Sequence, residues 1–83
     1  MKELVIASLL NAIESKSQIT LDVEVNDQSA IHTSFIPDAA EEIDDSVIIY
    51  KGTDVYSICG EVVSSENGVY VISNTYSTII LTL

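Results

Sequence analysis

The sequence contains a single cysteine, Cys59, among 83 residues, so it cannot form an internal disulfide framework. A lone thiol fits a reducing compartment. No run of residues approaches the about 18 consecutive apolar residues that a membrane-spanning helix requires. Lys2 followed by Leu4–Leu10 faintly resembles a signal peptide, but Glu3 interrupts the charged region and no Ala-x-Ala cleavage site follows. We therefore expect a cytoplasmic protein.

Positive charge is also scarce. Three Lys and no Arg stand against 13 Asp and Glu, which gives a formal net charge of -10 at pH 7. Because phosphate contacts depend on Lys and Arg, this composition disfavours direct binding to nucleic acid, and it disfavours anionic membranes as well. We expect a protein partner with a basic surface, such as the nucleic-acid-binding site of an enzyme. The alternative is that the charge serves solubility only.

Residue types that carry chemistry are few. His32 is the only imidazole, and beside Asp22 it could supply two members of a Ser-His-Asp triad, but no Gly-x-Ser-x-Gly elbow occurs, which favours a surface ion pair. Cys59 lies between Ile58 and Gly60, which is typical of an inert buried thiol. One Cys and one His cannot complete a usual zinc site, and no Asp-x-Asp-x-Asp-Gly calcium loop is present. We expect no enzymatic activity, no cofactor and no specific metal site.

The chain nevertheless has enough apolar residues to fold. Hydrophobic residues make up 47% of it, which is too many for a disordered acidic tail. Its length predicts one domain over residues 1–83, of modest stability because a chain this short buries only ~60–65% of its unfolded surface. Residues 3–15 are predicted to be a helix, since four large apolar residues follow the i, i+3, i+4, i+7 spacing of one face. These residues are Ile6, Leu9, Leu10 and Ile13.

The next two segments predict a hairpin. Residues 19–25 alternate apolar and polar, as in a half-buried strand, and residues 26–28 have turn composition. Residues 29–36 would then return beside the first strand. The register that keeps both apolar sets on one face pairs Val23 with Ile31, Leu21 with Thr33, Ile19 with Phe35 and Asp22 with His32.

The segment from Pro37 to Asp45 is predicted to be a short acidic helix. Proline suits the first helical position, and the helix would need support from the core because it is barely two turns long. Four of its carboxylates, those of Asp38, Glu41, Glu42 and Asp45, would share a face at a spacing that could imitate a row of backbone phosphates. The carboxylates that we expect to contact a partner are Asp22, Glu24, Asp38, Glu41, Glu42, Asp44 and Asp45.

The second half of the chain reads as successive strands. The predicted strands span residues 46–50, 55–59, 61–65, 69–72 and 75–83, and Gly60 marks a bulge or a bend. Asn67 and Gly68 are typical of a type I′ hairpin turn. Its predicted pairs are Glu66 with Val69, Ser65 with Tyr70 and Val63 with Ile72. Tyr70 is then expected on the polar face, where a tyrosine is well suited to contact a partner.

The C-terminal strand has two interpretations. Residues 77–83 are uncharged and free of Pro and Gly, so at a sheet edge they would need a partner strand. A second copy could supply it through Thr78, Ile80 and Thr82, which would make a homodimer. A central strand would also read as an apolar run.

These elements predict an α+β fold. An N-terminal helix would pack on an antiparallel meander sheet of about five to six strands, with the short acidic helix inserted after the second strand. The alternative is a small bent barrel, capped by the helix, in which the first and last strands close up. For function, we expect an inhibitor or regulator whose acidic face occupies a basic site on a partner protein. The size and charge of the chain resemble those of small phage-encoded inhibitors. The alternative is a structural or assembly subunit that uses its C-terminal strand and tyrosines.

Overall fold

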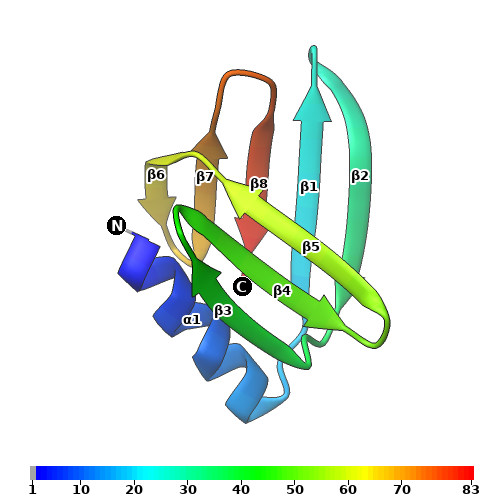
Figure 1. Cartoon of the computed structure of the whole chain (residues 1–83), viewed down its shortest axis with the longest axis vertical. Helices are drawn as coiled ribbons and strands as arrows, with labels where there is room; N and C mark the ends of the chain where they lie inside the picture. Colours follow the sequence, from blue (N-terminus) through cyan, green and yellow to red (C-terminus); the bar gives the residue numbers. More distant parts are fainter. Residues whose placement is uncertain (1) are drawn as a thin grey trace.

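The predicted α+β class is confirmed by the computed structural model, which describes residues 2–83. The elements are α1 (Lys2–Ser15), β1 (Ile19–Val25), β2 (Gln28–Phe35), β3 (Ala39–Ile43), β4 (Ser46–Lys51), β5 (Asp54–Cys59), β6 (Glu61–Glu66), β7 (Val69–Ser73) and β8 (Thr78–Thr82). The strands form a 5-stranded sheet in the order β2-β1-β8-β7-β6 and a 3-stranded sheet in the order β3-β4-β5 (Figure 1). The predicted single meander of fewer strands is therefore wrong.

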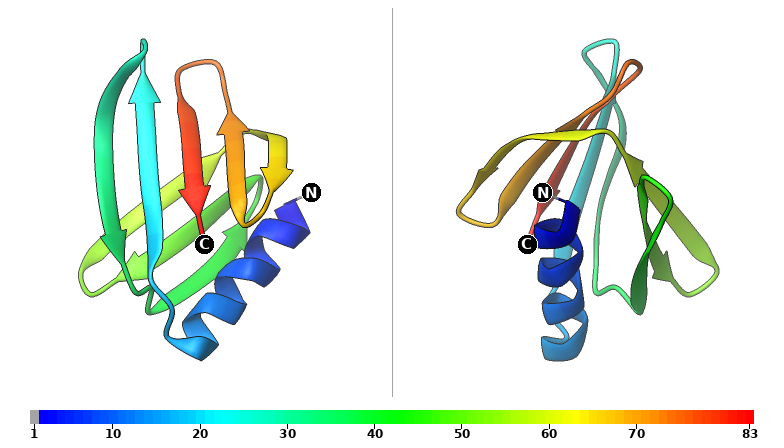
Figure 2. Two further views of the ribbon diagram at one scale, coloured as in Figure 1. Left: turned by 180° about the vertical axis from the view of Figure 1, so that it is seen from behind. Right: turned by 60° about the vertical axis from the view of Figure 1, so that its left-hand side comes forward.

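The two sheets face each other, and α1 closes the space between them. In Figure 1 the strands β3, β4 and β5 run diagonally in front of the larger sheet. The right-hand view of Figure 2 shows the sheets meeting at one end and diverging toward α1. Buried side chains from all three parts make one core. They are Val5, Leu9 and Ala12 of α1, Val47, Ile49 and Ile58 of the smaller sheet, and Ile19, Leu21, Tyr70, Ile72, Ile79 and Leu81 of the larger sheet.

The helix is where the sequence places it, but its buried face is rotated. Val5, Leu9 and Ala12 are buried at i, i+4 and i+7, whereas Leu10 is 49% exposed. The predicted stripe followed the largest side chains. The helix instead presents a stripe that includes the small Ala12, which lets its backbone approach the two sheets more closely than a Leu or Ile would.

The register of the first hairpin is confirmed. Ile19, Leu21, Asp22 and Val23 pair with Phe35, Thr33, His32 and Ile31. The turn is shorter than predicted, because Asn26 and Asp27 both have positive φ, at 53° and 62°, and form a two-residue turn. Ala30 is an extra residue in β2, opposite the step from Val23 to Glu24, and this bulge restores the register.

The predicted acidic helix is wrong, because residues 39–43 form the strand β3. Ile43 pairs with Ser46, so Asp44 and Asp45 make a two-residue turn in which Asp44 has a φ of 54°. All five residues of β3 pair with β4, which gives the segment backbone hydrogen bonds along one side, whereas a helix of barely two turns is costly to nucleate. Carboxylates on a strand point alternately to its two faces, so Glu41 and Glu42 face opposite ways.

The second predicted hairpin is confirmed near its turn and shifted beyond it. Glu66 pairs with Val69 and Ser65 with Tyr70, but Val62, not Val63, lies opposite Ile72, because β6 bulges at Val63. The expectation that Tyr70 lies on the polar face is also wrong. Its side chain is only 6% exposed, because residues two apart on a strand share a face and Ile72 is in the core. The Tyr70 hydroxyl forms a hydrogen bond with Ser8 Oγ of α1, at 2.8 Å.

The C-terminal strand is central. β8 pairs with β1 on one side and with β7 on the other, so Thr78, Ile80 and Thr82 have no open edge to offer a second copy. Pairing of β1 with β8 joins the first and last strands, as the barrel alternative required. In the described chain, however, β2 and β6 remain as edges, so the sheet does not close.

Candidate binding surface: an acidic groove

An open hollow of about 530 Å³ lies where the first turn of α1, the β3–β4 turn and the start of β6 meet. Gly60 and Val62 line it together with five acidic residues. These are Glu3, Glu42, Asp44, Asp45 and Glu61. We call this hollow the acidic groove. It brings together carboxylates from three segments that are far apart in the sequence.

The backbone at two turns positions these carboxylates. Asp44 and Asp45 occupy the β3–β4 turn, where aspartate tolerates the left-handed conformation that Asp44 adopts. Gly60, with a φ of 134°, bends the chain from β5 of the smaller sheet to β6 of the larger one and places Glu61 at the rim. Glu3 lies in the first turn of α1, where a negative charge suits the helix dipole.

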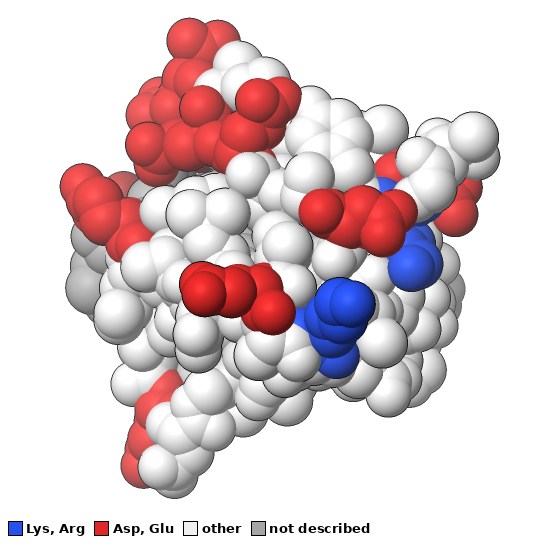
Figure 3. Space-filling model, turned by 90° about the horizontal axis from the view of Figure 1, so that it is seen from below, with Lys and Arg blue, Asp and Glu red and all other residues white. Residues whose placement is uncertain are grey.

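Among residues 3–83, no positively charged side chain lines the acidic groove. Lys51 lies at the opposite end of the β3–β4 pair, 3.6 Å from Asp38, and Lys16 follows the last turn of α1, about 20 Å along the helix from Glu3. Figure 3, which views the molecule from below, shows a dense cluster of acidic side chains in one region, with the lysine side chains drawn in blue away from that cluster and other acidic side chains scattered over the face. The groove therefore concentrates negative potential.

Three of the groove carboxylates are available to a partner. Glu42, Asp44 and Glu61 make no hydrogen bond or ion pair within residues 2–83, whereas Glu3 and Asp45 take part in interactions inside the chain. A concave surface with these carboxylates suits Lys or Arg side chains, which can form charge-assisted hydrogen bonds with carboxylates.

The structure divides the acidic face that the sequence predicted. Glu42, Asp44 and Asp45 line the groove, but Glu41 accepts a hydrogen bond from the Tyr50 hydroxyl on the other face of β3. Asp38 lies before β3 and accepts a hydrogen bond from the Gly52 N–H at 2.7 Å, which lowers the pKa of that carboxyl. Glu3 and Glu61 were missed, since only the tertiary fold brings them to the β3–β4 turn.

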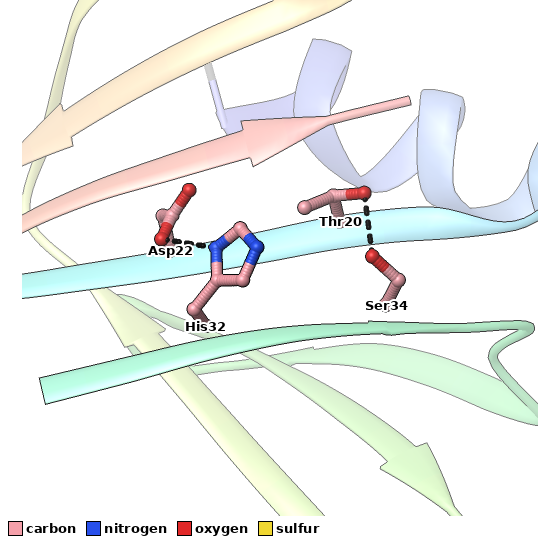
Figure 4. A network of polar contacts seen from close by, with 4 residues as sticks. All are labelled: Thr20, Asp22, His32 and Ser34. Atoms are coloured by element: carbon pink, nitrogen blue, oxygen red, sulfur yellow. Dashed lines mark hydrogen bonds and ion pairs between the residues drawn. The ribbon is translucent and has the colours of Figure 1, made fainter. Parts of the chain in front are cut away.

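The predicted pair of Asp22 and His32 forms on the outer face of the larger sheet. The Asp22 Oδ1 and His32 Nδ1 atoms lie 2.6 Å apart, and the neighbouring Thr20 and Ser34 hydroxyls form a hydrogen bond of 2.9 Å (Figure 4). The His32 side chain is 67% exposed, and no hydroxyl is hydrogen-bonded to it in the described chain. This arrangement is a surface acid–base pair without an attached nucleophile.

Glu24 lies outside the acidic groove and does not take part in the Asp22–His32 pair. It lines a second hollow, of about 200 Å³, with the β1–β2 turn and the β7–β8 loop.

The expectation that Cys59 is buried is wrong, because it is exposed at the end of β5 while Ile58 before it points inward. Asn74 Nδ2 donates a hydrogen bond to the Cys59 carbonyl at 2.9 Å and lies 3.8 Å from its Sγ.

Within residues 2–83, no group of three or more His, Cys, Asp or Glu side chains has the arrangement to hold a metal ion. In the same residues, no helix has the length and apolar character needed to cross a bilayer.

The hydrogen bond from Tyr50 to Glu41 raises the pKa of the Tyr50 phenol above its ordinary value of 10.0. We expect Glu41→Ala to lower this pKa toward 10.0, and Glu42→Ala, on the opposite face of β3, to leave it unchanged. Because the folded pKa is raised, the bond stabilises the fold below pH 10.0, and this contribution is lost as pH rises through the folded pKa. Ultraviolet titration of tyrosinate, with Tyr50→Phe to assign the signal, measures the shift. Equal curves for Glu41→Ala and the wild type would contradict it.

Comparison with family models, with curated proteins and with solved structures returns no match for this chain.

Proposed function

We propose that this chain is a small acidic binding protein that inhibits or regulates a partner protein by engaging its basic, nucleic-acid-binding site. The observation that supports this function is the acidic groove, in which Glu42, Asp44 and Glu61 converge from two strands and a turn. Lys or Arg side chains of the partner would enter the groove, in place of their contacts with nucleic-acid phosphates. The phosphate-like row once expected from a helix is replaced by a concave cluster of carboxylates.

The net charge supports the same function through the rate of association. With 13 acidic residues against three lysines, the whole molecule attracts a basic surface over long range, and the groove then orients the contact. Such association is fast at low ionic strength and weakens as salt screens the charges. The paired strand β3, the β3–β4 turn and the bend at Gly60 fix the backbone that carries these residues before binding, so complex formation orders their side chains only.

Charge reversal in the groove tests this function. We expect the double variant Glu42→Lys, Asp44→Lys to weaken binding to a captured basic partner by roughly 10- to 100-fold, because it places like charges against the partner's cations. The partner is first obtained by passing a cell lysate over the immobilised protein and eluting with a salt gradient. Affinity is then measured by surface plasmon resonance at several salt concentrations, with displacement by free DNA as a second readout.

The matched control is Asp54→Lys, Glu66→Lys, which makes the same change in net charge on exposed residues outside the groove. We expect it to slow association modestly, through the lost long-range attraction alone. Equal losses for the two double variants would show that net charge, and not the groove, determines binding. A captured partner whose binding is not weakened by salt, and which free DNA does not displace, would overturn the proposed function.

A further inference from the structure

The smaller sheet has an outer face that no other element covers. In Figure 1 the strands β3, β4 and β5 lie in front, and no helix or strand crosses the side turned to the viewer. Paired residues on neighbouring strands share a face, as do residues two apart on one strand, so this outer face consists of three rows of side chains. The rows are Ala39, Tyr50 and Val55, then Glu41, Ile48 and Ser57, and finally Ile43, Ser46 and Cys59.

This outer face is unusually apolar for a surface in contact with water. Among these described residues Glu41 alone is charged, and its carboxylate accepts the hydrogen bond from the Tyr50 hydroxyl. Val55 is 60% exposed and Ile43 is 47% exposed. The solvated face of an antiparallel sheet is ordinarily polar, and an exposed apolar area with a polar rim is typical of a contact with another protein.

Carboxylates lie at both ends of this apolar area. Asp44 and Asp45 form the β3–β4 turn directly beyond the last row, so this end of the outer face adjoins the acidic groove. Asp38 and Asp54 lie at the other end, where Lys51 is 3.6 Å from Asp38. The outer face therefore combines an apolar centre with acidic ends.

We infer that this outer face binds an amphipathic helix of a partner protein, with the apolar stripe of the helix on the sheet and its flanking Lys or Arg side chains directed to the carboxylates at the two ends. The inference rests on the proposed function, because it gives the basic partner a binding element whose cations reach the acidic groove. Charge complementarity selects this occupant. A second copy of the chain would bring like carboxylates together, and an uncharged helix would remove water from them without pairing them.

The dimensions of the smaller sheet suit one helix. Neighbouring strands lie about 4.8 Å apart, so three strands span about 10 Å, which is close to the diameter of an α-helix. The strands β3, β4 and β5 have 5, 6 and 6 residues, a length of about 17–20 Å that corresponds to about three to four helical turns. A helix of this length can contact Val55 at one end of the outer face and Ile43 at the other.

NMR spectra of the unmodified chain test where such a helix binds. The probe is a synthetic peptide of about 14 residues, in which leucine and lysine are spaced as in an amphipathic helix, and the control peptide has the same composition in scrambled order. We expect the helical peptide to shift the amide resonances of residues 39–59 together with those of the acidic groove, and the scrambled peptide to shift those of the groove alone. Shifts confined to the groove with both peptides, or equal shifts of residues 39–59 with both, would overturn the inference.

Substitution measures the apolar part of the contact. We expect the double variant Ile43→Ser, Val55→Ser to bind the helical peptide roughly tenfold or more weakly, with an unchanged dependence on salt because no charge is altered. The matched control is Leu10→Ser, Val63→Ser, since these side chains are 49% and 62% exposed and lie outside the outer face. It should leave the affinity nearly unchanged. Fluorescence anisotropy measures binding, and circular dichroism checks that each variant is folded. Equal affinities of the two double variants would contradict binding through this face.

The captured basic partner separates this inference from the proposed function. If Glu42→Lys, Asp44→Lys weakens its binding and Ile43→Ser, Val55→Ser does not, the proposed function stands and this inference is wrong. If only Ile43→Ser, Val55→Ser weakens it and salt has no effect, the proposed function is wrong, and the outer face remains a binding surface. Sedimentation velocity tests the remaining occupant. Self-association that Ile43→Ser, Val55→Ser abolishes would show that a second copy covers the outer face, and would overturn the inference.

Discussion

Replacing Gly60 with alanine is expected to destabilise the fold by about 2–5 kcal/mol, because the substitution combines backbone strain with a steric clash. The φ of Gly60 is +134°, a conformation that residues with a Cβ rarely adopt. A Cβ built at this position lies 2.5 Å from the Ser73 carbonyl oxygen and 2.8 Å from its carbon. These are backbone atoms of β7, so they cannot turn aside as a flexible side chain would. Denaturation in urea, followed by circular dichroism, measures the loss.

Gly52→Ala is the matched control for this substitution. Gly52 also has a positive φ, at +58°, but nothing lies within 4 Å of a Cβ added there. We therefore expect only the cost of the left-handed conformation, about 1–2 kcal/mol. Similar losses at the two glycines would show that the close approach between residue 60 and Ser73 is not important for stability.

The Gly60 substitution also bears on the proposed binding surface. Gly60 bends the chain between the sheets and is followed directly by Glu61 of the acidic groove. A movement of residue 60 away from Ser73 would shift Glu61, the next residue, relative to Asp44 and Glu42. A folded Gly60→Ala protein should therefore also bind a basic partner more weakly than Gly52→Ala does.

The second large effect is expected at Leu9, where alanine should cost about 2–5 kcal/mol in the free energy of unfolding. Leu9 is fully buried between the two sheets, so its removal leaves a cavity as well as losing apolar burial. A domain of 83 residues has a total stability of roughly 4–12 kcal/mol, so this variant should unfold at much lower denaturant concentration.

Leu10→Ala makes the identical change one residue along the helix. Leu10 is 49% exposed, so we expect a change of no more than about 0.5 kcal/mol. Thermal or urea denaturation of the two variants side by side measures the difference. Comparable losses of stability in the two variants would support the helix face predicted from the sequence, in which both leucines point inward.

Local patterns were reliable where neighbouring segments pack on each other. The period-two alternation of residues 19–25 placed Asp22 opposite His32, because apolar side chains on both strands must share a face. Asn67 and Gly68 located the β6–β7 turn, because both adopt the positive φ that a type I′ turn requires. The bulges at Ala30 and Val63 were not foreseen. An extra residue leaves no mark in composition and depends on how each strand twists against its partner.

The candidate surface was only partly predictable. The sequence indicated an acidic protein and identified Glu42, Asp44 and Asp45. It also joined them to Glu41, which points to the other face of β3, and to Asp38, which lies before β3 and binds the Gly52 N–H. Glu3 and Glu61 reach the same groove from distant segments, and no spacing in the sequence relates them.

By itself, the sequence determined the α+β class, the helix near the N-terminus, the register of the first hairpin beyond its bulge, that of the second hairpin near its turn, and the strong negative charge, because these depend on local periodicity, turn residues and composition. Tertiary structure alone decided the rest. It turned residues 39–43 into a strand, since pairing with β4 gives them backbone hydrogen bonds while a helix of barely two turns is costly to nucleate. It made β8 central and left β2 at an edge, and it buried Tyr70 against α1. Each of these outcomes depends on contacts between residues far apart in the chain, which local patterns do not encode.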